Sequence, residues 1–327
     1  MNIRLTALAR EIVARHPDAL GGGAAGPVIC AGGRTSTGLT VLKLASRGAL
    51  PSAVLKLAAS EEGKRALGRE TQVLRTLGAD EHLGAWRDLL PKARAHGTLR
   101  GYVYRIDAAL GGRAVTKPPA VSAPQLLSAA TDTIAVLHEI TATTVTGGEE
   151  LAQRWVDAPL GELLRRAGRG PRFADRLEQL RDELHGALAS GSFFAAWIHG
   201  DYWLGNLLFD HSFSPTGIVD WEAASPLELP LHDVLHLLLY TRRLASGREL
   251  GQLLRDQLVQ PRWSAAERTL LERQPAWEAR GGLTERHVLL LYWLRHAAVH
   301  ARQHASRVGR RYRLWEHRNV LPVLASL

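Results

Sequence analysis

The alternation of hydrophobic and polar residues predicts a strand-rich first third of the chain. Four short apolar or alternating runs are bounded by turn residues, the pattern of β-strands, and they cover residues 28–30, 39–44, 53–58 and 102–106. Glycine and hydroxyl residues at 32–38 predict a turn between the first two runs. Residues 61–77 carry apolar side chains at helical spacing after an acidic start, which predicts a helix between the third and fourth strands.

The rest of the chain is mostly helical in its pattern. Runs with a helical period cover residues 124–137, 173–188, 231–244 and 287–302. The amphipathic segment 1–16 is best interpreted as a first helix packed on the body of the protein. We therefore expect the α+β class, with a small β-rich lobe over residues 1–107 and a larger, mostly α-helical lobe over residues 108–327.

Composition places the chain among ordinary globular proteins. Of its 327 residues 46% are hydrophobic and 22% are charged, and the single cysteine, Cys30, excludes a disulfide within the chain. No apolar run approaches the ~18–20 residues of a membrane span, and the N-terminus lacks the apolar block of a signal peptide. We expect a cytoplasmic protein without a membrane partner.

The net charge of +9 is concentrated at one end of the chain. Residues 234–327 hold 16 Arg, no Lys and 7 acidic residues, which is 16 − 7 = +9. Arginines on solvated helix faces are one interpretation, and a basic surface for an anionic partner is the other. We expect no nucleic-acid partner, because the chain shows neither a helix-turn-helix pattern nor an aromatic stacking platform.

The most informative segment carries a predicted hairpin. Apolar runs at 207–209 and 217–219 flank a turn-rich middle. If the hairpin centres on Phe213, Asn206 lies opposite Asp220, and side chains opposed in this way have Cβ atoms ~5 Å apart. An amide oxygen and a carboxylate at the open end suit Mg²⁺, which prefers oxygen ligands and substrate phosphates.

A third oxygen-bearing side chain lies on the loop before this hairpin. Asp201 precedes Asn206 by five residues and could face an acceptor hydroxyl while the metal holds the phosphates. The order His-x-Asp-x4-Asn, from His199 onward, then a strand-borne Asp220, resembles the protein-kinase-like fold. His-Gly-Asp and Val-Asp-Trp-Glu are similar to the variants in the aminoglycoside phosphotransferase and choline kinase superfamily.

This resemblance extends over nearly the whole chain and implies a role for each residue of the segment. The implied roles are catalytic base or hydroxyl-orienting group for Asp201, Mg²⁺ ligands for Asn206 and Asp220, brace of the loop for His199, and anchor of the loop backbone for Asp233. It also implies a bilobal protein-kinase-like fold that binds ATP or GTP with Mg²⁺.

The first lobe supplies matching parts. Lys56 in Ala-Val-Leu-Lys resembles the family's strand lysine, and Glu70 lies 14 residues later on the predicted helix. Lys43 has nearly the same local sequence and is a rival, although it falls where the family places its second strand. The turn is expected over the nucleotide phosphates, with contacts from Gly32, Gly33, Ser36 and Thr37.

Two departures from protein kinases indicate a small-molecule acceptor. Gly200 replaces the arginine that often contacts a phosphorylated activation loop, and residues 221–232 are too few for a peptide-docking segment. The arginine-rich C-terminal third predicts a neutral or anionic hydroxylated acceptor, since a polycation would be repelled. The alternatives are a cationic aminoglycoside as acceptor, a nucleotide-binding pseudokinase, and a nucleic-acid-associated protein that uses the basic tail.

Five other positions carry weaker expectations. Asp107 is expected to be a solvated turn residue, and Glu222 is equally compatible with a role at the metal and with packing. His296 shares a predicted helix face with His300 and His304, which indicates a partly exposed basic face rather than a zinc site.

Overall fold

The computed structural model describes residues 3–20, 28–35, 37–45, 50–118, 121–165, 171–303 and 310–327. Ser36 and His304, two residues singled out above, lie outside these ranges. Contacts divide the chain into two units: Met1–Ala114 with Leu207–Glu222, and Val115–Asn206 with Ala223–Leu327. The hairpin segment thus belongs with the first unit. The expected single boundary after residue 107 does not describe this division, because the first unit is built from two separate stretches of the chain.

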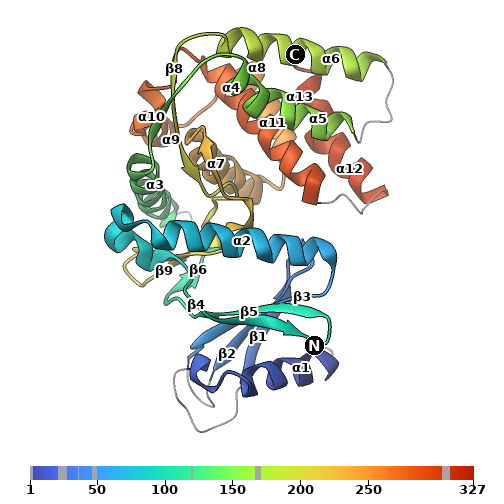
Figure 1. Cartoon of the computed structure of the whole chain (residues 1–327). Helices are drawn as coiled ribbons and strands as arrows, with labels where there is room; N and C mark the ends of the chain where they lie inside the picture. Colours follow the sequence, from blue (N-terminus) through green and yellow to red (C-terminus); the bar gives the residue numbers. More distant parts are fainter. Residues whose placement is uncertain are drawn as a thin grey trace. The chain divides into compact units, whose positions relative to one another are not determined.

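An antiparallel five-stranded sheet forms the centre of the first unit (Figure 1). Its spatial order is β1-β2-β3-β5-β4. The strands are β1 (Val28–Arg34), β2 (Thr40–Ala45), β3 (Ala53–Ala58), β4 (Ala93–Leu99) and β5 (Tyr102–Ala108). The strand that carries Lys56 is therefore central, and β4 is an edge strand.

Side-chain alternation along β3 assigns its residues to opposite faces of this sheet. Leu55 and Leu57 point into a core shared with helix α1 (Ile3–Ala14). Ala58 packs instead against helix α2 (Glu61–Ala79), which covers the other face (Figure 1). Lys56, one residue from each leucine, thereby lies on the α2 face. Ser60 caps α2 by accepting a hydrogen bond from the Gly63 amide.

A second, three-stranded sheet of the first unit carries the predicted hairpin. It consists of β6 (Arg113–Ala114), β9 (Leu207–Phe209) and β10 (Pro215–Ile218), in the order β10-β9-β6. The 3₁₀ helix η2 (Glu81–Leu89) completes the unit. The register pairs Leu207 with Ile218, one residue short of the expected register. The hairpin centres on residue 212 rather than Phe213, since Pro215 pairs with Phe209 next to the turn, and the irregularity between Pro215 and Gly217 recovers only one of the two residues.

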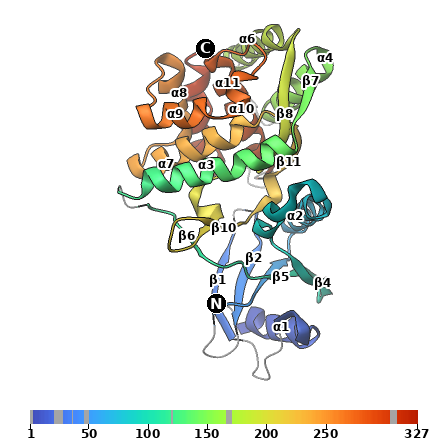
Figure 2. The same cartoon turned by 90° about the vertical axis from the view of Figure 1, so that its left-hand side faces the viewer.

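The second unit is mainly helical (Figure 2). A three-stranded sheet runs through it in the order β11-β8-β7, from β7 (Thr143–Thr146), β8 (Ser192–Ile198) and β11 (Ser225–Glu228). The longer helices are α3 (Ala123–Ile140), α6 (Pro171–Leu188), α7 (Leu231–Ser246), α8 (Leu250–Val259), α11 (Glu285–Gln303) and α12 (Arg310–Asn319). Shorter ones are α4 (Glu149–Ala152), η3 (Gln153–Asp157), α5 (Ala158–Leu164), α9 (Ala265–Glu272), α10 (Pro275–Glu278) and α13 (Leu321–Leu324). Within the described ranges, no helix has the length and apolar character needed to cross a bilayer.

The mixed α+β class predicted from the pattern is confirmed, with strands concentrated before helices. The predicted strand 53–58 coincides with β3, and the predicted helix 61–77 lies within α2. The turn predicted over 32–38 begins too early: Gly32 and Gly33 continue strand β1, and the chain reverses only after Arg34. Two glycines are tolerated in β1 because this edge strand is mostly exposed, so no side chain has to pack there.

Candidate active site

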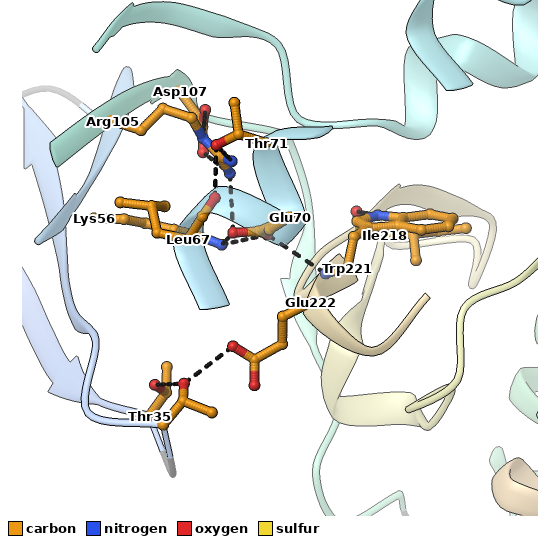
Figure 3. Close-up of polar contacts among 11 residues, drawn as sticks. Thr35, Lys56, Leu67, Glu70, Thr71, Arg105, Asp107, Ile218, Trp221 and Glu222 are labelled. Atoms are coloured by element: carbon orange, nitrogen blue, oxygen red, sulfur yellow. Dashed lines mark hydrogen bonds and ion pairs between the residues drawn. The ribbon is translucent and has the colours of Figure 1, made fainter. Parts of the chain in front are cut away.

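A buried ion pair joins the central strand of the first unit to helix α2. The Nζ of Lys56 lies 2.6 and 2.8 Å from the two carboxylate oxygens of Glu70, which is 0% exposed (Figure 3). Burial opposes the charge of both groups, yet each partner stabilises the other, so the pKa of Lys56 is raised and that of Glu70 is lowered. Both groups are therefore charged at neutral pH.

Arg105 is a second cation on the same carboxylate, and it was not anticipated from the sequence. It is paired in register with Lys56 on the neighbouring strand β5, and its Nη2 lies 3.0 Å from Glu70 Oε2. Its guanidinium also donates to both oxygens of Asp107, at 2.7 and 2.9 Å, and to the hydroxyl of Thr71 at 2.8 Å (Figure 3).

The expectation that Asp107 is a solvated turn residue is wrong. Asp107 is the penultimate residue of β5 and is only 2% exposed. Because it lies two residues after Arg105, it faces the same side of the sheet and neutralises the guanidinium there. The signal in the sequence was the spacing Arg105-x-Asp107 within a strand, which places opposite charges on one face.

The rival lysine has a different environment. Lys43 lies on β2, where it is exposed between the buried Leu42 and Leu44. Among the described residues no carboxylate pairs with it. The geometry therefore favours Lys56 as the strand lysine that a helix carboxylate holds in place.

The turn between β1 and β2 is connected to the segment after the hairpin. Thr37, 1% exposed, donates from its hydroxyl to Glu222 Oε2 at 3.0 Å and contacts the Thr35 hydroxyl at 2.9 Å. Gly38 follows at φ +86°, a left-handed conformation that favours glycine. Gly32 and Gly33 lie on β1 before this turn, and a Cβ atom added to Gly33 would meet no other atom within 4 Å.

Asp220 and Glu222 place two carboxylates close together after β10. Asp220 has φ +70°, a strained backbone conformation of the kind that clusters at functional sites. Burial and the charge of Asp220 raise the pKa of Glu222 to about 7. The intervening Trp221 lies with its backbone N–H 3.4 Å from Glu70 Oε1, so this segment also reaches the ion pair (Figure 3).

In the second unit, Asp233 holds the loop that follows strand β8. Its carboxylate accepts the backbone N–H of His199 at 2.7 Å and that of Gly200 at 2.8 Å. His138 lies 3.1 Å from the same carboxylate, which is 0% exposed. Burial alone would raise the pKa of Asp233, but His138 and the backbone donors lower it. The fixed carboxylate thus determines the path of the His-Gly-Asp loop.

Asp201 and Asn206 lie against each other at the end of this loop. The Asn206 Nδ2 donates to the backbone oxygen of Asp201 at 2.9 Å and to its carboxylate at 3.1 Å. This use of the amide nitrogen makes the amide oxygen the atom available to a cation. His199, which is 0% exposed, accepts the Asp201 backbone N–H at its Nδ1 over 3.3 Å.

A cluster of rings lies beside the Asp201 carboxylate and was also missed from the sequence. His236 on α7 has its Nε2 3.0 Å from Asp201 Oδ1 and its Nδ1 2.8 Å from the Tyr292 hydroxyl. Burial opposes ionisation of Asp201, but the adjacent His236 imidazole lowers its pKa. Two helices that are distant in the sequence, α7 and α11, build this cluster, so only the helix packing reveals it.

The histidines of α11 do not form the expected basic face. His296 stands 5.2 Å from the His236 ring, and burial lowers its pKa to about 3, so it is uncharged at neutral pH. His300 stacks on Trp315 at 3.8 Å. The preceding Arg295 does carry charge, and its Nη2 donates to the Ala223 carbonyl at 2.8 Å beside Gly200.

A strand lysine paired with a helix glutamate, and a separate loop carrying aspartate and asparagine, are features of kinase-like phosphotransferases. The chain belongs to the phosphotransferase enzyme family (APH), whose model matches residues 36–269 of the 327. It is therefore a phosphotransferase, as the resemblance implied. No curated protein sequence matches the chain.

Solved structures confirm the protein-kinase-like fold at low sequence identity. Aminoglycoside phosphotransferase APH(3'')-Id from Streptomyces rimosus has a TM-score of 0.54 and 17% identity, covering 91% of this chain and 99% of its own. Macrolide 2'-phosphotransferase type I has a TM-score of 0.53 and 16% identity, covering 100% and 96%. A thermostable mutant of APH(4)-Ia with AMP-PNP and hygromycin B has a TM-score of 0.58 and 15% identity, covering 98% of both chains.

Replacing Asp233 by Ala tests the anchoring of the loop. The variant loses the acceptor for two backbone N–H groups, and each unsatisfied buried group costs ~1–3 kcal/mol. We expect the free energy of unfolding, measured by urea denaturation, to fall by roughly 3 kcal/mol. Asp210→Ala is the matched control: Asp210 also accepts two backbone N–H groups, but on an exposed turn, and its loss should cost less than about 1 kcal/mol.

The contribution of Asp233 to the free energy of unfolding should depend on pH. Since the pKa of Asp233 is lowered on folding, its contribution is complete above the ordinary aspartate pKa of about 3.9 and is lost as the pH falls below that value toward the pKa in the folded state. The stability difference between the wild type and Asp233→Ala should therefore shrink on acidification. A difference that stays constant from neutral to strongly acidic pH would contradict this account.

Proposed function

We propose that this phosphotransferase moves the γ-phosphoryl group of ATP or GTP, with Mg²⁺, to a hydroxyl group of a small molecule. The observation that carries the proposal is the contact of Asp201 with Asn206 on a loop anchored by Asp233. An ionised carboxylate that accepts a hydrogen bond from an amide N–H, and so leaves the amide oxygen available, suits a reaction in which one group orients a hydroxyl and the other binds a metal.

Asp201 is the proposed catalytic residue. In the transfer, the acceptor oxygen bonds to the γ-phosphorus, the bond from that phosphorus to the bridging oxygen of the nucleoside diphosphate breaks, and the hydroxyl proton goes to the Asp201 carboxylate. Its lowered pKa supports this role, because only the ionised carboxylate accepts a hydrogen bond from the hydroxyl. His199 and Asp233 act as positioning residues of the loop.

Asn206 and Asp220 are the proposed Mg²⁺ ligands. Asn206 directly precedes β9, and Asp220 follows β10 by two residues, so both adjoin the same hairpin in the chain. The residues fit a cation: the amide oxygen of Asn206 is an available donor, and the raised pKa of Glu222 reflects its burial beside the negative charge of Asp220. When bound, Mg²⁺ neutralises the charge on the phosphates.

Lys56 is the proposed phosphate-binding cation, oriented by Glu70. Its ammonium group has three donors, and Glu70 fixes the side chain in the buried position that Figure 3 shows. Gly32 and Gly33 on strand β1 and Thr37 on the turn that follows are proposed to contact the phosphates, as is Ser36, which lies outside the described residues.

The acceptor is proposed to be neutral or anionic. Similar phosphotransferases have been solved in complex with streptomycin and with hygromycin B, so an antibiotic acceptor is one possibility to test. In this chain the surroundings of Asp201 in the second unit are aromatic and basic: Trp203 lies 4.8 Å from Tyr240, and Arg243 covers the Tyr240 ring at 4.9 Å. The aromatic rings suit the ring of a sugar or natural product, and the positive charge of Arg243 beside them disfavours a polycation.

The basic C-terminal third supports a neutral or anionic acceptor less strongly than its composition indicated. Nine of its arginines have ion-pair partners in the described part of the chain, namely Arg242, Arg243, Arg248, Arg255, Arg268, Arg273, Arg286, Arg295 and Arg318. Much of this charge is therefore used within the fold, which favours the interpretation of solvated helix faces.

A nucleotide-consumption screen over hydroxylated compounds tests the function. We expect Mg²⁺-dependent turnover with a neutral or anionic sugar, nucleoside or macrolide, and loss of about 10³-fold in kcat for Asp201→Asn with nucleotide binding retained. Turnover that Asp201→Asn leaves intact would refute the role of Asp201. A strong preference for polycationic aminoglycosides would refute the proposed acceptor class.

Paired substitutions of the two similar lysines test the phosphate-binding role. Lys56→Ala should weaken nucleotide binding and lower kcat/KM by about 10²-fold or more, since a charge-assisted contact is lost in a buried site. Lys43→Ala is the matched control on the exposed side of β2. It should change the nucleotide affinity and kcat/KM by no more than about twofold from the wild-type values. Steady-state kinetics and nucleotide titration measure both effects. A larger effect of Lys43→Ala than of Lys56→Ala would assign the phosphate-binding role to Lys43.

His236→Ala tests whether the imidazole positions the Asp201 carboxylate. We expect kcat to fall by about tenfold while the KM for the nucleotide stays unchanged, because the misplaced group acts on the acceptor hydroxyl alone. Tyr292→Phe, which removes only the hydrogen bond to Nδ1, should have a smaller effect in the same direction. His287→Ala, on the same helix as Tyr292, should behave as the wild type in both parameters.

A further inference from the structure

A cavity of about 770 Å³ lies in the first unit, apart from the residues assigned above to catalysis. Its walls are the second half of α2, the 3₁₀ helix η2, and the edge strand β4. This volume falls within the range of small-molecule sites, which is roughly 300–1,000 Å³.

Basic side chains dominate the lining of this cavity. Besides Arg105, whose charge Glu70 and Asp107 compensate, the wall carries the basic side chains of Arg75, Arg87, Lys92 and Arg94 and one carboxylate, that of Asp88. That carboxylate lies 2.7 Å from the Lys92 ammonium, so the pair is already neutral. The three arginines therefore determine the charge of the cavity.

These three arginines lack acidic partners within the described ranges. Arg87 donates to the carbonyls of Gly84 and Gly78, at 3.2 and 3.4 Å, and Arg94 donates to the Ala19 carbonyl at 2.7 Å. Carbonyl partners hold a guanidinium in place but leave its charge uncompensated. For Arg75 the described part of the chain shows no polar partner at all, although most arginines of the second unit's C-terminal part have a carboxylate.

Apolar side chains supply the remaining wall. Leu74 of α2 lines the cavity together with Leu90 and Pro91, which lie between η2 and β4. A site of this composition binds a molecule with an anionic head and an apolar or ring-shaped body, since arginine forks match phosphate and carboxylate geometry.

We propose that this cavity, named here the α2–β4 site, binds a small molecule that carries a phosphate group beside an apolar or ring moiety. Lys56 is not among its lining residues, and Arg105, which is one of them, is engaged with Glu70 and Asp107. The ligand therefore binds independently of the proposed nucleotide contacts, and the site does not depend on the proposed reaction.

Isothermal titration with phenyl phosphate tests the site on the full chain at low salt and neutral pH. We expect saturable one-to-one binding that weakens about tenfold in Arg75→Ser and further in Arg75→Ser combined with Arg94→Ser. Arg75→Ser should fold normally, since it removes no polar contact within the described residues. Arg65→Ser, on the exposed surface of the same helix and outside the cavity lining, is the matched control and should keep the wild-type affinity.

Three further titrations distinguish the contributions of the anion, the ring and the proposed nucleotide site to the measured affinity. Phenol should bind at least tenfold more weakly than phenyl phosphate because it lacks the anion, and inorganic phosphate should also bind more weakly because it lacks the ring. Asp220→Asn, which changes a residue of the proposed nucleotide site but removes no member of the buried charge network, should bind phenyl phosphate as the wild type does. The absence of binding, equal affinity in Arg75→Ser and Arg65→Ser, or loss of binding in Asp220→Asn would each overturn the proposal.

Discussion

The buried charge network around Glu70 is the constraint on which the first unit depends. Two cations, Lys56 and Arg105, and two anions, Glu70 and Asp107, are all at most 7% exposed, so their charges must compensate one another. Removing one member leaves the others uncompensated in a low-dielectric interior, which typically costs about 3–5 kcal/mol. Strands β3 and β5 and helix α2 therefore have to adopt their positions together.

This network also explains why the proposed phosphate-binding lysine needs no ligand to orient it. Glu70 holds the ammonium group on one side, while the neighbouring Arg105 holds Glu70. In the second unit Asp233 has the same effect on the His-Gly-Asp loop by accepting two of its backbone N–H groups. Each unit thus fixes its own polar groups in advance, the property that makes electrostatic stabilisation of a transition state effective.

Much of this arrangement could be predicted from the sequence where residues follow a local pattern. The alternation in 53–58 fixes the face of Lys56, and the helical period of 61–77 brings Glu70 toward that face. The hairpin and the Asp201–Asn206 spacing are local as well. These predictions needed only the periods of strands and helices.

Other features depend on which elements pack together, and no local pattern encodes that. Arg105 reaches Glu70 because β5 pairs with β3, and β4 was not predicted at all. His236 and Tyr292 meet although 56 residues separate them. The predicted register of the hairpin was wrong by one residue at Leu207, because the turn centres on residue 212 instead of Phe213 and an irregularity at Pro215–Gly217 only partly offsets this difference.

Gly200 has a consequence for how the protein can be controlled. It adopts φ +79°, and any side chain at this position would overlap the Ala223 carbonyl and the Arg295 guanidinium. Protein kinases commonly place here an arginine that senses a phosphorylated loop, and this backbone has no space for one. The His-Gly-Asp loop is instead held by Asp233 and Arg295 through its backbone, so this position offers no side chain through which a phosphorylated segment could act on the loop.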